Sequence, residues 1–191
     1  MGRIVISENV SLDGVVQDPA GAEGFSRGGW VGRVGDRGRD EAAKVLLDEH
    51  LRAEALLQGR RTYEFLAARW PSRGGELATR MNSMPKYVVS STLADPRWNN
   101  TMVISGDVVT EVSNLKHELN GEIVVAGSIQ LVRTLIQNDL VDEVRLMVYP
   151  VVLGAGDRLF GETGDALPMR LVTSAAIDDL AYLCYEVVRN A

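Results

Sequence analysis

Residues 123–126 of the chain, Ile-Val-Val-Ala, form a short run without a polar side chain. A strand that is apolar on both faces must be covered on both faces, which is typical of the centre of a parallel sheet. Further short strand patterns occur at residues 4–6, 55–58, 87–89, 102–104 and 144–148. Helical patterns separate most of these strands. This alternation predicts an α/β fold with a mixed, mostly parallel sheet and helices on both faces.

The last part of the sequence has a different pattern. Residues 171–173 and 183–188 are strand patterns with no helical pattern between them, and their connection contains Asp178 and Asp179. Such a pair predicts an antiparallel edge to the sheet. A length of 191 residues is ordinary for one domain, and neither a linker nor a repeat interrupts the chain. We therefore expect a single domain over residues 1–191.

Three small polar residues stand where helical patterns begin. Asp40 precedes a stripe of alanine and leucine residues, Thr62 precedes Tyr63 and Phe65, and Ser128 precedes Ile129. Side chains of this kind accept hydrogen bonds from the first N–H groups of a helix. Asp40, Thr62 and Ser128 are therefore predicted as helix N-caps.

The segment between Asp13 and Gly38 is unusually rich in glycine, with eight glycines from Gly14 onward and one proline, Pro19. A loop of this length inside a compact domain is often a lid or a binding loop. The alternative is a flexible excursion without a role, and the sequence leaves both open.

Composition excludes several classes of protein. The formal charge is 20 − 26 = −6, which argues against a general nucleic-acid binder and against adhesion to an anionic membrane. The single cysteine, Cys184, rules out an internal disulfide and a Cys-rich zinc site, and neither His50 nor His117 has metal-binding spacing. The first residues lack the apolar run of a signal peptide, and no stretch resembles a membrane span. We expect a cytoplasmic protein without a metal.

Three strand ends carry residues that suit an anionic ligand. Gly59, Arg60, Arg61 and Thr62 follow the strand at residues 55–58. The glycine lets a ligand approach the backbone, the following helix presents free N–H groups, and the arginines add forked donors for phosphate. The alternative is a pair of surface arginines in ordinary ion pairs.

The other two strand ends carry weaker signals of the same kind. Ser90, Ser91 and Thr92 follow one strand, and their hydroxyl groups suit phosphate or ribose, or else an ordinary turn. Gly127 and Ser128 separate the strand at residues 123–126 from a helix, which suits a diphosphate or is a plain βα turn. Because ligands bind beyond the carboxyl ends of strands in such sheets, the three turns together suggest a large phosphorylated ligand such as a dinucleotide.

Two further features concern a substrate. Asp13, followed by Gly14, places a carboxylate at the mouth of the glycine-rich segment, where it orients a substrate or assists proton transfer, or else makes an Asx turn. Gly154 and Gly156 form a glycine turn that does not lead from a strand into a helix. This turn is a poor phosphate loop and is expected instead to shape a substrate pocket.

Five segments, taken in order, resemble a known family. They are Ser-Leu-Asp-Gly at 11–14, Leu-Gln-Gly-Arg-Arg-Thr-Tyr-Glu at 57–64, Val-Val-Ser-Ser-Thr at 88–92, Val-Ala-Gly-Ser at 125–128 and the segment from Leu140 to Gly156. The chain resembles the dihydrofolate-reductase-like family that includes the C-terminal reductase domain of the bacterial riboflavin-biosynthesis deaminase-reductase (RibD). It looks closest to stand-alone members. The resemblance spans nearly the whole chain.

The resemblance implies a dihydrofolate-reductase-like three-layer fold and NADPH as hydride donor. It assigns the cofactor phosphates and ribose to residues 59–62, 90–92 and 127–130, a set that includes Ile129 and Gln130. Arg60 and Arg61 are then natural partners for the 2′-phosphate that distinguishes NADPH from NADH. The resemblance also implies that Asp13 and the glycine-rich segment border the substrate, and that the protein is a homodimer.

The sequence departs from the riboflavin reductases at one cofactor turn. They usually carry Glu-Gly-Gly where this chain has Ala126, Gly127 and Ser128. This leaves the substrate open, and we expect reduction of a C=N or C=O group in a small heterocyclic or sugar-derived molecule, as in 5-amino-6-(5-phosphoribosylamino)uracil reductase. The alternatives are a non-catalytic nucleotide-binding homodimer that kept the fold and a dihydrofolate or pteridine reductase.

Overall fold

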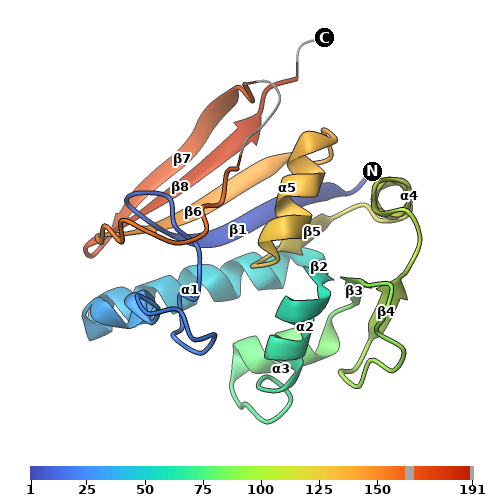
Figure 1. Ribbon diagram of the computed structural model, residues 1–191, viewed down its shortest axis with the longest axis horizontal. Coiled ribbons are helices and arrows are strands. Elements are labelled where there is room, and N and C mark those ends of the chain that lie inside the picture. Colours follow the sequence, from blue (N-terminus) through green and yellow to red (C-terminus); the bar gives the residue numbers. More distant parts are fainter. Residues whose placement is uncertain (162–165, 190–191) are drawn as a thin grey trace. The chain divides into compact units, whose positions relative to one another are not determined.

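The computed structural model describes residues 1–161 and 166–189 (Figure 1). Its sheet has eight strands in the order β4-β3-β2-β5-β1-β6-β8-β7. The strands are β1 (Arg3–Ser11), β2 (Ala53–Gly59), β3 (Lys86–Val89), β4 (Thr101–Ile104), β5 (Glu122–Val125), β6 (Glu143–Tyr149), β7 (Met169–Ile177) and β8 (Leu180–Val187). The helices are α1 (Asp36–Arg52), α2 (Arg60–Ala67), α3 (Glu76–Ser83), α4 (Val108–Glu118) and α5 (Ile129–Gln137), with a 3-10 turn η1 (Trp30–Arg33).

The pairing of the strands confirms the predicted fold class. β1 and β2 each pair with β5 in parallel, and β3 pairs in parallel with both β2 and β4. β6, β8 and β7 pair antiparallel and form the C-terminal edge. The sheet is therefore mixed and mostly parallel, as the alternation of strand and helix patterns predicts.

The chain divides into two compact units. The first comprises residues 1–6 and 46–142, and the second comprises residues 7–45 with the described part of 143–191. In the first unit, Gly59 lies opposite Val89, and Val89 lies opposite Ile104. The turns that follow β2, β3 and β4 therefore begin at one edge of the sheet, and those after β2 and β3 are two of the three predicted ligand turns.

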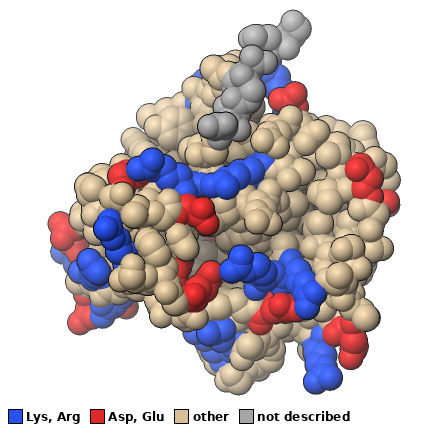
Figure 2. Space-filling view, in the orientation of Figure 1, with Lys and Arg blue, Asp and Glu red and all other residues tan. Residues whose placement is uncertain are grey.

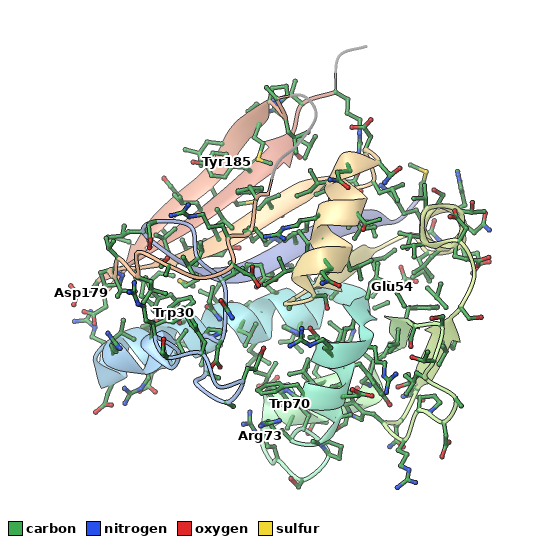
Figure 3. All side chains as sticks on the ribbon, in the orientation of Figure 1. Trp30, Glu54, Trp70, Arg73, Asp179 and Tyr185 are labelled. Atoms are coloured by element: carbon green, nitrogen blue, oxygen red, sulfur yellow. The ribbon has the colours of Figure 1, made fainter. Side chains whose placement is uncertain are left out.

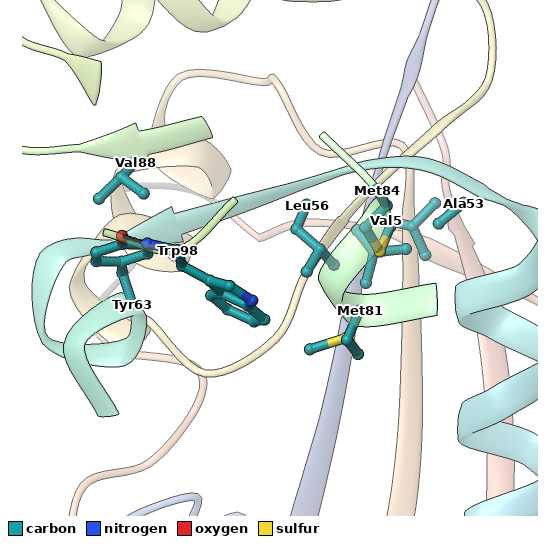
Figure 4. Packing of buried hydrophobic residues seen from close by; sticks show 9 residues of the cluster. Val5, Ala53, Leu56, Tyr63, Met81, Met84, Val88 and Trp98 are labelled. Carbon is teal, nitrogen blue, oxygen red and sulfur yellow. Dashed lines mark hydrogen bonds between the residues drawn. The ribbon is translucent and has the colours of Figure 1, made fainter. Parts of the chain in front are cut away.

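One apolar cluster in the first unit fixes α2 and α3 against the sheet (Figure 4). Leu56, Val88 and Val124 come from three neighbouring strands and are all buried. The rings of Tyr63 and Trp98 lie 6.2 Å apart, and the main-chain N–H of Trp98 donates to the Tyr63 hydroxyl at 3.0 Å. Tyr63 is in the first turn of α2, so this contact holds the start of that helix at the strand ends.

The second unit is built around a buried tryptophan, Trp30 (Figure 3). Its ring meets Tyr149 of β6 edge-on, with centroids 5.3 Å apart, and its indole N–H donates to the Gln17 carbonyl at 3.0 Å. Val15, Leu153 and Leu180 complete the cluster. The glycine-rich segment therefore contributes its own apolar anchor to the unit.

A buried carboxylate organises the rest of that segment. Asp18 is 3% exposed and accepts hydrogen bonds from the backbone N–H groups of Ala22 (2.7 Å), Glu23 (3.1 Å) and Phe25 (3.1 Å). A Cβ atom on Gly28 would lie 2.4 Å from an Asp18 oxygen, so only glycine fits there. Residues 18–28 thus form a turn wrapped around one side chain, which the glycine content alone does not predict.

The expected start of α1 is wrong. The helix begins at Asp36, so Asp40 lies inside it and is not the N-cap. Arg39 pairs with Asp36 and donates to the Val34 carbonyl at 3.0 Å. These contacts hold the first turn even though it contains Gly38, a residue that weakens a helix by about 1 kcal/mol.

Candidate functional site

The turns after β2 and β5 are joined by two side-chain hydrogen bonds. The Gly59 N–H donates to Ser128 Oγ at 2.9 Å, and the Ser128 N–H donates to Thr62 Oγ1 at 2.9 Å. Gly127 has a φ of 65°, and a Cβ atom there would lie 3.1 Å from Thr62 Oγ1 and Cγ2. The two turns therefore approach each other closely enough to require glycine at position 127.

The predicted N-cap is wrong for Thr62, and for Ser128 only the position is confirmed. Gly59 is the N-cap of α2, which places Thr62 in the first turn of that helix, where its hydroxyl accepts from Ser128. Ser128 does stand at the N-cap of α5, but its φ of 61° is left-handed and its hydroxyl accepts from Gly59 instead of from its own helix. Both hydroxyls are used to connect the turns rather than to cap a helix.

As a result, neither α2 nor α5 has a side-chain cap. The first N–H groups of a helix carry partial positive charge and need an acceptor from outside the helix. In α2 these groups belong to residues that include Arg61 and Thr62, and in α5 to Ile129 and Gln130. Two uncapped N-termini beside a glycine turn suit the oxygens of a phosphate group.

The turn after β3 is fixed by Ser90. Its N–H donates to the Ile104 carbonyl at 2.9 Å, and its hydroxyl accepts from the N–H groups of Thr92 (3.2 Å) and Leu93 (3.0 Å). The Ser90 hydroxyl therefore shapes the turn, whereas Ser91 and Thr92 are exposed.

Arg60 links this third turn to the first. Its Nη1 donates to Thr92 Oγ1 at 2.5 Å, and its Nε donates to Glu64 Oε1 at 2.7 Å. Arg61 is exposed, and within the part of the chain that the structure describes its side chain makes no hydrogen bond or ion pair. The three predicted turns are thus brought together at one edge of the first unit, with one arginine held and the next free.

Two residues at this edge escaped the sequence analysis. Ser105 follows β4 directly and is exposed, and the bond from Ser90 to Ile104 places it beside the turn after β3. Its signal is a Ser-Gly-Asp segment at the end of a short strand pattern. Glu64 is the other, and its signal is the i,i+4 spacing from Arg60.

The predicted substrate residues all lie in the second unit, where the structure also brings them together. Asp13 Oδ1 accepts from the Leu153 N–H (3.0 Å) and the Ser11 hydroxyl (2.7 Å), and Oδ2 accepts from the Gly154 N–H (2.8 Å). Gly14 has a φ of 83°, and its carbonyl accepts from Leu159 at 3.1 Å. These bonds join two segments about 140 residues apart in sequence.

Gly156 closes this arrangement. Its φ is 119°, and a Cβ atom there would lie 2.7 Å from Val15 Cγ1. Any other residue would therefore push apart the segments that Asp13 ties together.

The bonds to Asp13 determine its charge. The Leu153 N–H first, and then the Ser11 hydroxyl and the Gly154 N–H, lower the pKa of this carboxyl from 3.8 to about 2. Asp13 is therefore ionised at neutral pH with both oxygens engaged, and this favours the turn role over proton transfer.

Other reactive side chains are buried. His50 lies in α1 with its Nδ1 2.7 Å from the Leu46 carbonyl, and burial lowers its pKa. Burial also raises the pKa of the Cys184 thiol to about 11, with a further contribution from Glu143. Across residues 1–161 and 166–189, no group of three His, Cys, Asp or Glu side chains is arranged to hold a metal ion.

Surface charge is mixed on the face drawn in Figure 2, where Lys and Arg side chains are interspersed with Asp and Glu. Among the described helices, none has both the length and the apolar composition needed to cross a membrane.

Comparison with known proteins places these observations in a family. The sequence-family model of the RibD C-terminal domain matches residues 3–182 of this chain. The uncharacterized protein YyaP of Bacillus subtilis is 28% identical over 177 residues, which cover 90% of this chain and 87% of YyaP.

Three solved structures are similar in fold. A protein from Shewanella sp. PV-4 assigned to riboflavin biosynthesis has a TM-score of 0.76 and 23% identity, with 98% of this chain and 99% of that chain covered. A deaminase/5-amino-6-(5-phosphoribosylamino)uracil reductase of Thermotoga maritima has a TM-score of 0.66 and 13% identity, with 98% and 57% covered. Dihydrofolate reductase of Enterococcus faecalis, complexed with NADP(H), has a TM-score of 0.61 and 15% identity, with 97% and 96% covered.

Proposed function

Because the chain belongs to the RibD C-terminal domain family, which is of the reductase type, we propose that it is an NADPH-dependent reductase. The observation that carries this proposal is the pair of uncapped N-termini of α2 and α5, joined through Ser128 and Thr62 beside Arg60. The residues present fit a dinucleotide, because they offer main-chain donors for a diphosphate and guanidinium donors for a further phosphate.

Each turn has a part in holding the cofactor. The first-turn N–H groups of α5, at Ile129 and Gln130, and of α2, at Thr62, bind the diphosphate, while Gly59 and Gly127 let it approach the backbone. Ser91 and Thr92 offer exposed hydroxyls for the ribose and its 2′-phosphate, and Thr92 contacts Arg60. When bound, NADPH supplies a hydride from its nicotinamide ring to a C=N or C=O carbon of the substrate.

The substrate is a small heterocyclic or sugar-derived molecule. Gly14, Gly154 and Gly156 border it, and Asp13 holds the turn that carries Gly154 in place. The same proposal includes the homodimer that the resemblance implies, together with the single domain over residues 1–191 and the cytoplasmic location that the length and composition of the chain predict.

Calorimetric titration of the purified protein with NADPH and NADH, side by side, tests the cofactor. Tight binding of NADPH and weak binding of NADH is the expected result, since only NADPH carries a 2′-phosphate for Arg60. Arg60→Ala should weaken NADPH far more than NADH. Equal weakening of the two would contradict the assignment of Arg60, and no binding of either would contradict the reductase.

The reaction is tested by the fall in NADPH absorbance with pteridines, flavin precursors and small carbonyl compounds. Binding of NADPH without oxidation by any of these acceptors would favour the non-catalytic alternative. Turnover of dihydrofolate together with binding of methotrexate would identify a dihydrofolate reductase instead.

A further inference from the structure

We infer that Glu64 is a positioning residue for Arg60, and that together with Thr92 it sets the preference for a 2′-phosphorylated nucleotide. The inference rests on the proposed function and names a determinant of its cofactor specificity. It starts from a difference between two neighbouring arginines. Arg60 has two anchors, whereas Arg61, also exposed, has none among the described residues.

Arg60 needs anchors because it is a surface residue. The side chains of Arg60 and Glu64 are 45% and 48% exposed, and a free arginine of that exposure samples many rotamers. Ordering such a side chain when a ligand binds reduces the affinity. A guanidinium that is already held in place avoids most of that loss.

Each anchor is itself fixed. Glu64 lies one turn along α2 from Arg60, at the i,i+4 spacing that brings two helix side chains together. Thr92 lies in the turn that Ser90 ties to β4 through the Ile104 carbonyl. Arg60 is therefore held between a helix and a strand end rather than by one flexible partner.

The two anchors leave part of the guanidinium available. Arginine has five N–H donors, of which Glu64 takes one on Nε and Thr92 takes one on Nη1. The donors that remain on Nη1 and Nη2 lie beside Thr92, which is proposed with Ser91 to contact the ribose. A phosphate on that ribose meets an arginine whose direction is already set.

The charge of Glu64 opposes this effect. A carboxylate near a phosphate repels it, so Glu64 would lower affinity if its charge mattered more than its bond to Arg60. Because the pair is about half exposed, water and salt screen the repulsion. We therefore expect alignment of Arg60 to outweigh the repulsion, and the two effects predict opposite outcomes when Glu64 is removed.

The test compares 2′,5′-ADP with 5′-AMP as probes, by calorimetry, for the wild type, Glu64→Ala, Glu64→Gln and Thr92→Val. Glu64→Ala should weaken 2′,5′-ADP by roughly three- to tenfold, a typical effect of losing one ordering contact. Glu64→Gln should stay within about twofold of the wild type, because its amide oxygen still accepts from Arg60 Nε. Thr92→Val should weaken 2′,5′-ADP less than Glu64→Ala does, and 5′-AMP should bind equally to the wild type and to both Glu64 variants.

Glu41→Ala is the matched control, since it removes the same charge from another surface pair, Glu41 with Lys44 in α1. It should leave both probes unchanged. Tighter binding of 2′,5′-ADP to Glu64→Ala would show that repulsion dominates and would overturn the inference. Equal weakening of both probes, or no change in either, would overturn it as well.

Failure of the proposed function has a different signature. A wild-type protein that binds neither probe nor NADPH would overturn the reductase and this inference together. A wild-type protein that prefers 2′,5′-ADP, with Glu64→Ala unchanged, would overturn the inference and leave the cofactor assignment intact.

Discussion

The turns at the strand ends of the first unit and the turns of the glycine-rich segment use main-chain N–H groups in opposite ways. After β2 and β5, the hydroxyls of Thr62 and Ser128 accept one N–H each, and the helix N-termini that follow stay uncapped. In the second unit, the carboxylates of Asp13 and Asp18 accept five backbone N–H groups between them.

This difference distinguishes two kinds of turn. We call a turn open where the N–H groups of the following helix have no side-chain cap, and complete where a carboxylate of the chain accepts the N–H groups. Clustered N–H groups attract an anion. In the second unit the chain supplies that anion from its own side chains, so the turns are satisfied without a partner. At the N-termini of α2 and α5 no side chain of the described residues acts as a cap, and a phosphate would bring the charge and the acceptors that suit them.

The largest expected effect is a loss of stability when the carboxylate of a complete turn, Asp18, is removed. Asp18→Ala leaves three N–H groups of a buried turn without their acceptor and should lower the free energy of unfolding by about 3 kcal/mol. Urea denaturation measures the loss. Asp18→Asn keeps the shape and one oxygen, so its loss should be smaller. A loss under about 0.5 kcal/mol for Asp18→Ala would mean that the carboxylate does not hold the turn.

Lys86 is a buried charged side chain of the first unit, as Asp18 is of the second. Its contribution to the free energy of unfolding is expected to depend on pH. This buried ammonium donates to the carbonyls of Met84 (2.9 Å), Asn99 (3.0 Å) and Asn82 (3.4 Å), and lies 4.4 Å from the Trp98 ring. Burial, with a smaller contribution from Arg80, lowers the pKa of Lys86 from 10.5 to about 8. Between these values the unfolded chain binds a proton that the folded chain has released, so stability rises with pH.

The measurement compares wild type with Lys86→Met by urea denaturation from pH 7 to pH 10. The free energy of unfolding of the wild type should gain roughly 1 to 3 kcal/mol relative to the variant across this window. The exposed Lys44→Met is the control and should show no such gain. A constant difference between wild type and Lys86→Met would contradict the lowered pKa.

Gly127→Ala probes the open turns. The added Cβ atom would meet Thr62 at 3.1 Å in a left-handed conformation, which together cost about 1 to 2 kcal/mol. NADPH should bind roughly tenfold more weakly, because the strain falls on the bond between Thr62 and Ser128. Gly74→Ala is the control, since its Cβ atom has no neighbour within 4 Å. Equal affinity of both variants would mean that the joined turns do not form the cofactor site.

Local sequence patterns predicted the strands well and selected three turns that lie together, whose binding of a ligand stays a prediction. The apolar run at residues 123–126 corresponds to β5, paired with two strands, and the three turns chosen from their residues meet at one edge. The reason is that each signal is local: a short apolar run, a glycine at a strand end, a helix pattern after it. Parallel strands then bring their carboxyl ends together whatever the details.

The hydrogen-bond partners of the turn hydroxyls could not be predicted, because these bonds join residues that are distant in sequence. Thr62 and Ser128 look like caps, yet each hydroxyl bonds to the other's turn, 66 or more residues away. The sequence did not predict the role of Asp18, since its carboxylate oxygens accept from main-chain N–H groups of an irregular loop. The start of α1 at Asp36 was missed for a different, local reason, since the i,i+3 pair of Asp36 with Arg39 extends the helix by one turn before Asp40.

Asp13→Asn is expected to have the smallest effect on stability. It tests whether Asp13 only holds the turn at Leu153 and Gly154 or also affects turnover. The pKa of Asp13 is lowered to about 2, so its contribution to stability is present above the ordinary pKa of 3.8 and is lost as pH falls toward 2. Thermal unfolding should show a gap between wild type and variant that is constant from pH 5 to pH 7 and closes between about pH 4 and pH 2. A gap that persists in acid would mean that the carboxylate is not held by these N–H groups. Steady-state kinetics of the same variant should show lower turnover with nearly unchanged NADPH affinity, because the displaced turn is proposed to border the substrate and not the cofactor. An unchanged turnover would restrict Asp13 to holding its turn.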